Sequence, residues 1–313
     1  MATDVSNTSS NEASKGSIFL RGASALTNSF SLAHGNSQGG RIMKRLAEIL
    51  TVSLSGGVLL FSNTALADES GCAGLPTQSE LQAALTAATA TETSGLNNQM
   101  WATIVNRDGI VCAVAFSGAN RSAQWPGSRV ISAQKANTGN AFSLDSSSSS
   151  NGSGQPAGLA LSTANLYSAV NPGGSLYGLQ HSNPVNPEVA YAGNPGSYGK
   201  ANDPMVGERI GGVNVFGGGL ALYAVGKVVV GGLGVSGDTS CADHNIAWRV
   251  RHNLGLDHLL GVAGVSGDPN RPDNIVYDIV PNPNGGTGNS AGGFGHPRCI
   301  NTGDQTTLPA VQP

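Results

Sequence analysis

The sequence contains few charged and few aromatic side chains. Of its 313 residues, 11% are Asp, Glu, Lys or Arg and 5% are Phe, Trp or Tyr. The 16 Lys and Arg residues are outnumbered by 19 Asp and Glu residues, which gives a formal net charge of −3. Nucleic-acid binding depends on releasing counterions from phosphates, and this requires a basic surface. We therefore expect no nucleic-acid partner.

Several motifs of common enzymes and metal sites are also missing. The sequence has no His-Glu-x-x-His motif, so a zinc protease is not indicated. No two Cys residues have Cys-x-x-Cys spacing, which argues against metal binding by cysteines. The segment Gly234-Val-Ser236-Gly237, which precedes a predicted helix, lacks the Gly-x-Ser-x-Gly spacing of a hydrolase nucleophile elbow. Hydrolysis is therefore not favoured.

Glycine is abundant, with 45 residues, and there are 15 prolines. Hydrophobic residues still make up 39% of the chain, which is enough to form a core and excludes disorder of the whole chain. Together these values indicate a globular domain with long irregular segments.

The N-terminal region has the pattern of an export signal. Lys44 and Arg45 precede an apolar stretch, and Ala65-Leu66-Ala67 is a small-x-small cleavage motif. The stretch is shorter than the roughly 20 apolar residues that span a bilayer. We expect a signal peptide over residues 43–67 and a periplasmic or secreted mature protein. Residues 1–42 are then a disordered, spurious extension ahead of the true start.

Four cysteines follow the predicted cleavage site, namely Cys72, Cys112, Cys241 and Cys299. An even number of cysteines in an exported chain favours two disulfides. Three pairings are possible, and the order along the chain does not choose among them. Pairing Cys72 with Cys112 and Cys241 with Cys299 would tie one flanking segment to the core in each case.

Hydrophobic periodicity predicts a single α+β domain over residues 75–260. Helices are expected over 77–94 and 128–142 and from Asp238 to Gly255. Two hairpins are expected, formed by residues 101–105 with 110–116 and by 217–224 with 228–235. Paired strands flanked by helices form a mostly antiparallel sheet. Residues 143–203 are predicted to be a Gly, Ser and Pro-rich insertion, and 261–313 a Gly, Asn and Pro-rich tail.

A glycine motif precedes the last predicted helix. Gly232-Leu-Gly234-Val-Ser-Gly237 fits the dinucleotide pattern Gly-x-Gly-x-x-Gly, and Asp257 lies twenty residues after Gly237. That motif requires a parallel β-α-β unit, whereas the strand here belongs to a hairpin. We therefore expect the glycines to allow close packing. The amides at the helix start could still bind the carboxylate of a small organic acid.

Four sequence blocks resemble the GlcG/HbpS-like haem-binding proteins, whose domain also occurs at the C-terminus of PduO-type proteins. The blocks are Asn106-Arg-Asp-Gly109 with Val111, Arg129 to Thr138, Gly211 to Gly219, and Gly231 to Asp243. They occur in the family's order and span residues 77–255.

The resemblance implies a five-stranded antiparallel sheet, assembly into homo-oligomers and binding of haem b. In some relatives it also implies haem degradation or signalling to a membrane-bound sensor partner, and it does not decide whether this chain is an enzyme. The chain departs from the family in its long insertion, its tail and its cysteines. It also has no histidine between Thr77 and Asn98 to serve as an axial ligand.

Haem requires an axial donor, an apolar slot and donors for its propionates. His244 and His181 are the predicted iron ligands, because imidazole suits iron. Arg129, Lys135 and Arg209 are predicted to meet the propionates, and Phe216 to flank the ring with Trp125 and Tyr223. Asp238 and Thr239 complete the predicted binding residues. The alternatives are an extracytoplasmic scaffold protein and an organic-acid binder without haem.

Overall fold

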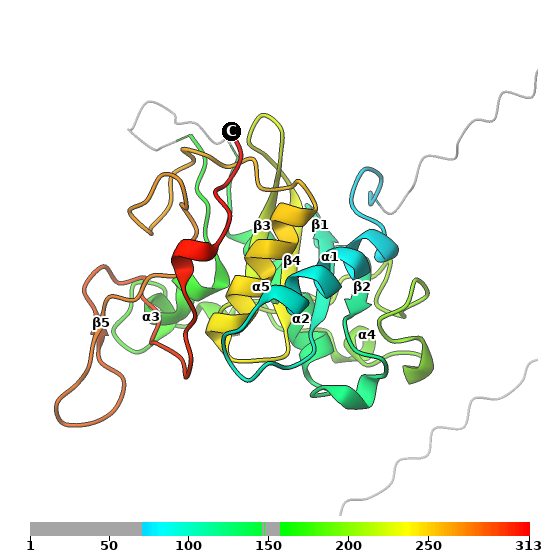
Figure 1. Ribbon diagram of the computed structural model, residues 1–313, viewed down its shortest axis with the longest axis horizontal. Coiled ribbons are helices and arrows are strands. Elements are labelled where there is room, and N and C mark those ends of the chain that lie inside the picture. The colour runs from blue at the N-terminus through cyan, green and yellow to red at the C-terminus, as the bar shows by residue number, and fades with distance from the viewer. Residues whose placement is uncertain (1–70, 146, 148–156) are drawn as a thin grey trace, which may run out of the picture. The chain divides into compact units, whose positions relative to one another are not determined.

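The computed structural model describes residues 71–145, 147 and 157–313 (Figure 1). The predicted extension 1–42 and signal peptide 43–67 lie outside the described residues. Among the residues described, no helix is long and apolar enough to cross a membrane.

A four-stranded antiparallel sheet forms the centre of the described part of the chain, in the order β2-β1-β4-β3. Its strands are β1 Trp101–Asn106, β2 Val111–Phe116, β3 Gly219–Ala224 and β4 Val228–Ser236. Both predicted hairpins are therefore present. The turns reverse the chain through left-handed residues, Gly109 between β1 and β2 and Gly226 between β3 and β4.

The prediction of five strands in one sheet is wrong. Within the described residues the main sheet has four strands, and β5 Ile279–Val280 pairs with β6 Asn289–Ser290 in a separate two-stranded sheet.

The segment beside β2 shows why no fifth strand forms in the main sheet. The Val111 amide donates to the Glu208 carbonyl at 2.9 Å, and the Gly207 amide donates to the Val111 carbonyl at 2.9 Å. This pairing stops after one bridge between Ile110 and Arg209. Gly207, Gly211 and Gly212 have φ values of 89°, 64° and 87°, and such left-handed residues interrupt an extended strand.

Three long helices cover the sheet, as predicted. They are α1 Gln78–Thr91, α2 Ser128–Ala141 and α5 Ser240–Asn253. A capping box of Thr77 and Glu80 starts α1, and the Thr239 side chain caps α5. Helices α1 and α5 pack together on one face of the sheet and α2 on the other (Figure 1).

The alternation of strand side chains supplies a core on each face. Ala102 and Ile104 of β1 belong to the core beneath α1 and α5, whereas Trp101 and Val105 belong to the core beneath α2. This is the period of two expected for a strand buried on both faces.

The glycines of β4 allow α2 to pack unusually close to the sheet. A Cβ atom at Gly234 would lie 1.8 Å from the Ser132 carbonyl oxygen, and one at Gly232 would lie 2.2 Å from that of Ala136. Since β4 has antiparallel partners on both sides, it is not part of a dinucleotide-binding unit. The Gly-x-Gly-x-x-Gly pattern therefore serves helix packing.

Short elements lie before α2, in the insertion and in the tail. These are η1 Arg121–Ala123 before α2, then η3 Thr163–Asn165, α3 Leu166–Val170, η4 Leu179–His181, α4 Pro187–Ala190, η5 Pro195–Ser197 and η6 Gln305–Thr307. The end of the tail returns to α5, where Leu308 and Val311 join the core. The Trp248 indole N–H donates to the Pro309 carbonyl at 2.9 Å.

Two disulfides connect these parts. Cys72 pairs with Cys112, which ties the segment before α1 to β2, and Cys241 pairs with Cys299, which ties the tail to the start of α5. The structure thus selects one of the three pairings that the sequence left open.

Candidate functional site

The start of α5 gathers five of the predicted binding residues in one polar region. They are Lys135 of α2, Phe216 before β3, and Asp238, Thr239 and His244 at or beside the helix start. The region forms because β4 ends at Ser236 and α5 begins only four residues later.

Lys135 is enclosed by its own partners. Its Nζ lies 2.6 Å from Asp243 Oδ2, donates to the Val235 carbonyl at 3.0 Å and lies 4.2 Å from the Phe216 ring centre. Neither charged side chain of the pair is exposed. Burial lowers the pKa of Lys135 and raises the pKa of Asp243 to about 6, although the attraction between them opposes both shifts. Lys135 and Asp243 therefore form an internal ion pair, with the Phe216 ring against the ammonium group.

Asp238 and Thr239 bind the protein's own backbone. The Asp238 carboxylate accepts hydrogen bonds from the amides of Leu96 at 2.8 Å and Asn98 at 3.0 Å. Asp243 Oδ1 accepts from the Asp238 amide at 2.8 Å. Two carboxylates thus already occupy the positive end of α5. This arrangement does not favour the organic-acid alternative.

His244 is completely buried on α5. Its Nε2 lies 3.2 Å from Asn274 Oδ1, and its Nδ1 has no hydrogen-bond partner. Burial lowers the pKa of His244 to about 4, so the ring is neutral at pH 7. His244 does not line the aromatic pocket described below. Its role as an iron ligand stays a prediction.

The remaining predicted residues lie on other elements. His181 is exposed at the end of η4, and Arg209 is exposed beside the β1–β2 turn, where its Nε donates to the Asp108 carbonyl at 2.9 Å. Tyr223 is buried in β3, and its hydroxyl donates to the Leu144 carbonyl at 3.1 Å. The structure therefore does not bring all the predicted residues to one place.

Arg129 is buried near the start of α2 and forms a bidentate ion pair. Its Nε donates to Asp203 Oδ2 at 2.9 Å, its second contact is with Asp203 Oδ1, and a third nitrogen donates to the Ala190 carbonyl at 2.9 Å. The guanidinium lies over the Tyr198 ring, 3.6 Å from its centre. Arg129 thus fixes segments of the insertion against α2.

A cavity of about 430 Å³ lies beside Arg129, and we call it the aromatic pocket. It is lined by Trp101, Arg121, Ser122, Pro126, Gly127, Arg129, Tyr191 and Tyr198. Trp101 is buried and stacks on Phe116 with ring centres 4.5 Å apart. Arg121 and Tyr191 are exposed at the surface. The pocket therefore combines aromatic walls with a surface cation.

The sequence predicts binding roles for Arg129 and the neighbouring Trp125 but not for Trp101, Arg121, Tyr191 or Tyr198. Both tyrosines come from an irregular insertion, which has no periodicity from which to place them. The sequence does mark Trp101 as the aromatic residue that begins the predicted strand 101–105. That Trp101 shares a sheet face with α2 is visible only in the structure.

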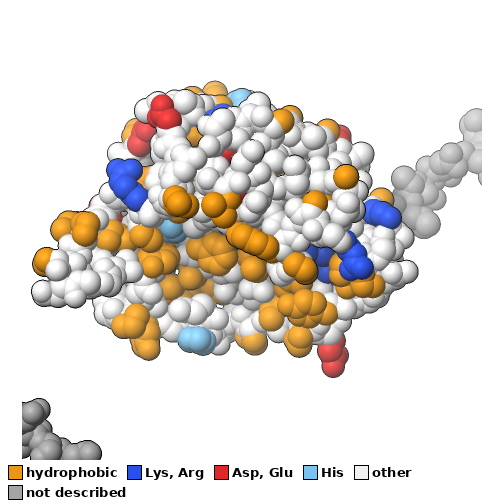
Figure 2. Space-filling view, turned by 60° about the horizontal axis from the view of Figure 1, so that its bottom comes forward, with side chains coloured by type: hydrophobic (Ala, Val, Ile, Leu, Met, Phe, Trp, Pro, Cys, Tyr) orange, Lys and Arg blue, Asp and Glu red, His pale blue; other side chains and the backbone are white. Residues whose placement is uncertain are grey.

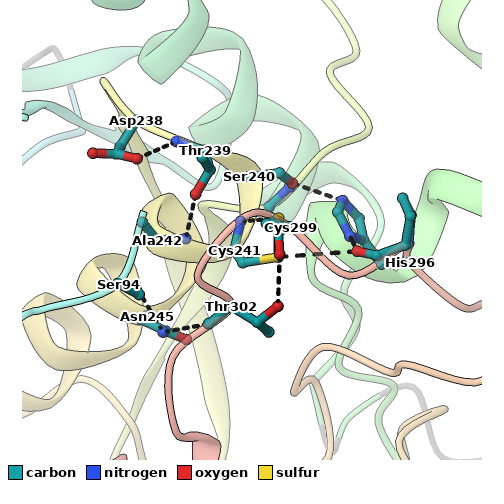
Figure 3. The surroundings of a disulfide bond; sticks show 12 residues. Ser94, Asp238, Thr239, Ser240, Cys241, Ala242, Asn245, His296, Cys299 and Thr302 are labelled. Atoms are coloured by element: carbon teal, nitrogen blue, oxygen red, sulfur yellow. Dashed lines mark hydrogen bonds between the residues drawn. A yellow bond between two sulfur atoms is a disulfide. The ribbon is translucent and has the colours of Figure 1, made fainter. Parts of the chain in front are cut away.

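A second polar cluster surrounds the Cys241–Cys299 disulfide (Figure 3). Ser240 Oγ lies 2.7 Å from His296 Nε2, and His296 Nδ1 lies 2.7 Å from the Pro297 carbonyl oxygen. The Cys241 amide donates to Cys299 Sγ at 3.1 Å. Burial lowers the pKa of His296 to about 4.

Three solved structures are similar to this chain. Protein ORFY of Klebsiella pneumoniae has 24% identity and a TM-score of 0.35, and the match covers 56% of this chain and 87% of that one. A PduOC:heme complex has 21% identity and a TM-score of 0.35, covering 56% and 89%. A double mutant of HbpS from Streptomyces reticuli has 15% identity and a TM-score of 0.30, covering 66% and 97%. No curated protein matches the sequence.

A family model described as "Haem degrading protein HbpS-like" matches residues 77–251. These residues run from the cap of α1 through nearly all of α5 and include the whole main sheet. Because the match covers more than half of the chain, this protein belongs to the HbpS-like family.

Proposed function

We propose that this protein binds haem and that the aromatic pocket holds it. The observation that carries the proposal is a cavity of about 430 Å³ lined by the rings of Trp101, Tyr191 and Tyr198, with Arg121 exposed at the surface beside them. Aromatic walls with a nearby cation suit a flat apolar ligand that carries acidic groups. Family membership identifies haem as the ligand to test first.

The lining residues fit the chemistry of haem. The rings of Trp101, Tyr191 and Tyr198 offer apolar walls for the porphyrin. The guanidinium of Arg121 is suited to a propionate. Arg129, which the sequence analysis assigned to a propionate, is saturated by Asp203 and Ala190 and instead holds Tyr198 in place.

None of the lining residues is a histidine, so the pocket itself offers phenol oxygens as iron donors. Tyrosine is an established haem ligand in proteins. Tyr191 is 64% exposed, and the Tyr198 hydroxyl donates to the Ala192 carbonyl at 3.0 Å. We propose that one of these two phenols binds the iron, with His181 and His244 as the alternatives from the sequence.

The proposed cofactor is haem b, which is bound without covalent attachment. Covalent haem requires free cysteines in a Cys-x-x-Cys-His motif. All four cysteines of this chain are in disulfides, which leaves none to form a thioether.

Export to the periplasm or beyond, assembly into homo-oligomers and contact with a membrane-bound sensor are further parts of the proposal. The two disulfides support an oxidising compartment. Figure 2 shows hydrophobic side chains gathered in a band across one face of the molecule, with Lys and Arg side chains beside it. Exposed apolar surface of this kind supports an assembly of subunits.

The test is a haem titration of the full chain, followed by visible absorption. We expect saturation at a single haem per chain. Arg121→Gln should weaken binding by about tenfold, a factor that corresponds to ~1.4 kcal/mol. Either Tyr191→Phe or Tyr198→Phe should change the absorption of the ferric complex, and Tyr177→Phe, a change at an exposed tyrosine outside the pocket, should not.

Two outcomes would count against this site. If the spectrum changes only in His181→Gln or His244→Gln, haem binds elsewhere and the sequence-based ligands are correct. If the wild-type chain shows no saturable binding, haem is not its ligand.

A further inference from the structure

The Cys241–Cys299 disulfide has a histidine beside it. One ring nitrogen of His296 and the two Sγ atoms all lie within 4.8 Å of one another. Cys241 and His296 are buried and Cys299 is half-buried. Within the described part of the chain, no second group of three or more His, Cys or acidic residues brings its ligand atoms as close together.

We propose that reduction of the Cys241–Cys299 disulfide creates a binding site for a thiophilic dication such as Zn²⁺. The ligands are the two thiolates and the imidazole of His296, with a water molecule or the Ser240 hydroxyl in the fourth position. Two Cys and one His with an open fourth position form a common zinc ligand set. The proposal goes beyond haem binding and does not depend on it.

The chemistry balances with a dithiol as the reductant. The S–S bond of Cys241–Cys299 breaks and accepts two electrons and two protons. The dithiol supplies them and closes to its own disulfide. Zn²⁺ then forms two Zn–S bonds and releases the two thiol protons to solvent.

The backbone geometry suits the reduced site. Tetrahedral Zn–S bonds of about 2.3 Å place two sulfur atoms about 3.8 Å apart. The Cα atoms of Cys241 and Cys299 are 6.0 Å apart, which allows this separation by side-chain rotation. His296 and Cys299 are three residues apart, a chelating spacing that the absence of a Cys-x-x-Cys motif does not exclude.

The hydrogen bonds of His296 define its tautomer. A carbonyl oxygen can only accept, so the 2.7 Å contact with Pro297 means that Nδ1 carries the proton. The lone pair is therefore on Nε2, where the Ser240 hydroxyl now donates. Metal-binding histidines usually donate their second ring N–H to a carbonyl or carboxylate in this manner.

The position of the sulfur atoms also favours thiolates. Cys241 lies in the first turn of α5, and its amide donates to Cys299 Sγ at 3.1 Å. Amides at a helix start stabilise negative charge on sulfur.

The experiment uses the full chain, reduced with a dithiol that is then removed under argon, and Co²⁺ as a spectroscopic probe. We expect one Co²⁺ per chain with thiolate-to-cobalt absorption, displaced by Zn²⁺. The control is the double variant Cys72→Ser/Cys112→Ser, which lacks the other disulfide and should keep the absorption. The double variant Cys241→Ser/Cys299→Ser should lose it. His296→Gln should weaken binding by roughly tenfold or more, whereas the matched His258→Gln should not.

Several results would overturn the proposal. They are absence of Co²⁺ absorption in the reduced wild-type chain, an equal signal in Cys241→Ser/Cys299→Ser, and unchanged affinity in His296→Gln. Circular dichroism of the reduced chain is recorded in parallel. A chain that unfolds on reduction and binds no metal also overturns it.

Discussion

Buried charges in this protein are paired, and the pairs hold separate segments together. The structure contains three such ion pairs among its described residues, Arg129–Asp203, Lys135–Asp243 and Arg251–Asp273. Burying a charge is expensive unless a partner and hydrogen bonds compensate for it. This explains why Arg129 and Lys135, which the sequence predicts to meet the haem propionates, instead pair with Asp203 and Asp243.

The buried His244 should make stability depend on pH. Burial lowers the pKa of this histidine from 6.5 to about 4. The folded chain therefore binds fewer protons than the unfolded chain between these values. The neutral buried ring therefore contributes to the free energy of unfolding fully above pH 6.5, and this contribution is lost as the pH falls towards 4. The free energy lost over this range is about 3 kcal/mol.

Urea unfolding measured from pH 7 to pH 4 checks this prediction. We expect His244→Gln to lose less stability over this range than the wild-type chain. The exposed His181→Gln should follow the wild type. Asp243 titrates near the same range in all three chains and so cancels in the comparison. Equal slopes in wild type and His244→Gln would contradict the assignment.

At the scale of elements, the contact between α2 and β4 depends on missing side chains. Gly234→Ala would place a Cβ atom 1.8 Å from the Ser132 carbonyl oxygen, so the helix must move away from the sheet. We expect a loss of about 3 kcal/mol or more in the free energy of unfolding. Gly127→Ala is the control, because a Cβ atom there meets nothing within 4 Å and φ is −66°. Similar values for the two variants would refute the close-packing argument.

Most of the regular elements could be predicted from the sequence. The Thr77 and Glu80 capping box, the Asp108-Gly109 turn and the β-branched and aromatic run of β1 are local features of the sequence, and the structure has a helix, a turn and a strand at these places. The number of strands could not be predicted in this way. The number of strands depends on whether the pairing of residues 207–209 with β2 extends into a full strand. The left-handed conformations of Gly211 and Gly212 prevent that extension.

The residues of the candidate site could not be predicted from the sequence for a related reason. Tyr191 and Tyr198 reach the pocket from an insertion whose path is fixed by Asp203 and Arg129, a contact 74 residues apart in the chain. His296 meets Ser240 across 56 residues. Contacts between residues so far apart in the chain produce no periodic pattern in a single sequence.

At the scale of the whole described region, the tail belongs to the core. Val311 is 6% exposed and packs with α5, whereas Val280 in β5 is 67% exposed. We expect Val311→Ala to lower the free energy of unfolding by roughly 2 kcal/mol and Val280→Ala to change it by less than about 0.5 kcal/mol. Chemical denaturation of both variants measures this difference. Equal, small effects would mean that the tail contributes nothing to the core.

The return of the tail to α5 also has a consequence for the timing of folding. The core beneath α5 lacks Leu308 and Val311, and Cys241 lacks its partner, until these residues have been synthesised and have emerged. The final packing of α5 must therefore wait for a segment more than 50 residues downstream of Asn253. The core beneath α5 is consequently completed only after these residues have joined it, and until then the apolar face of α5 is exposed to aggregation.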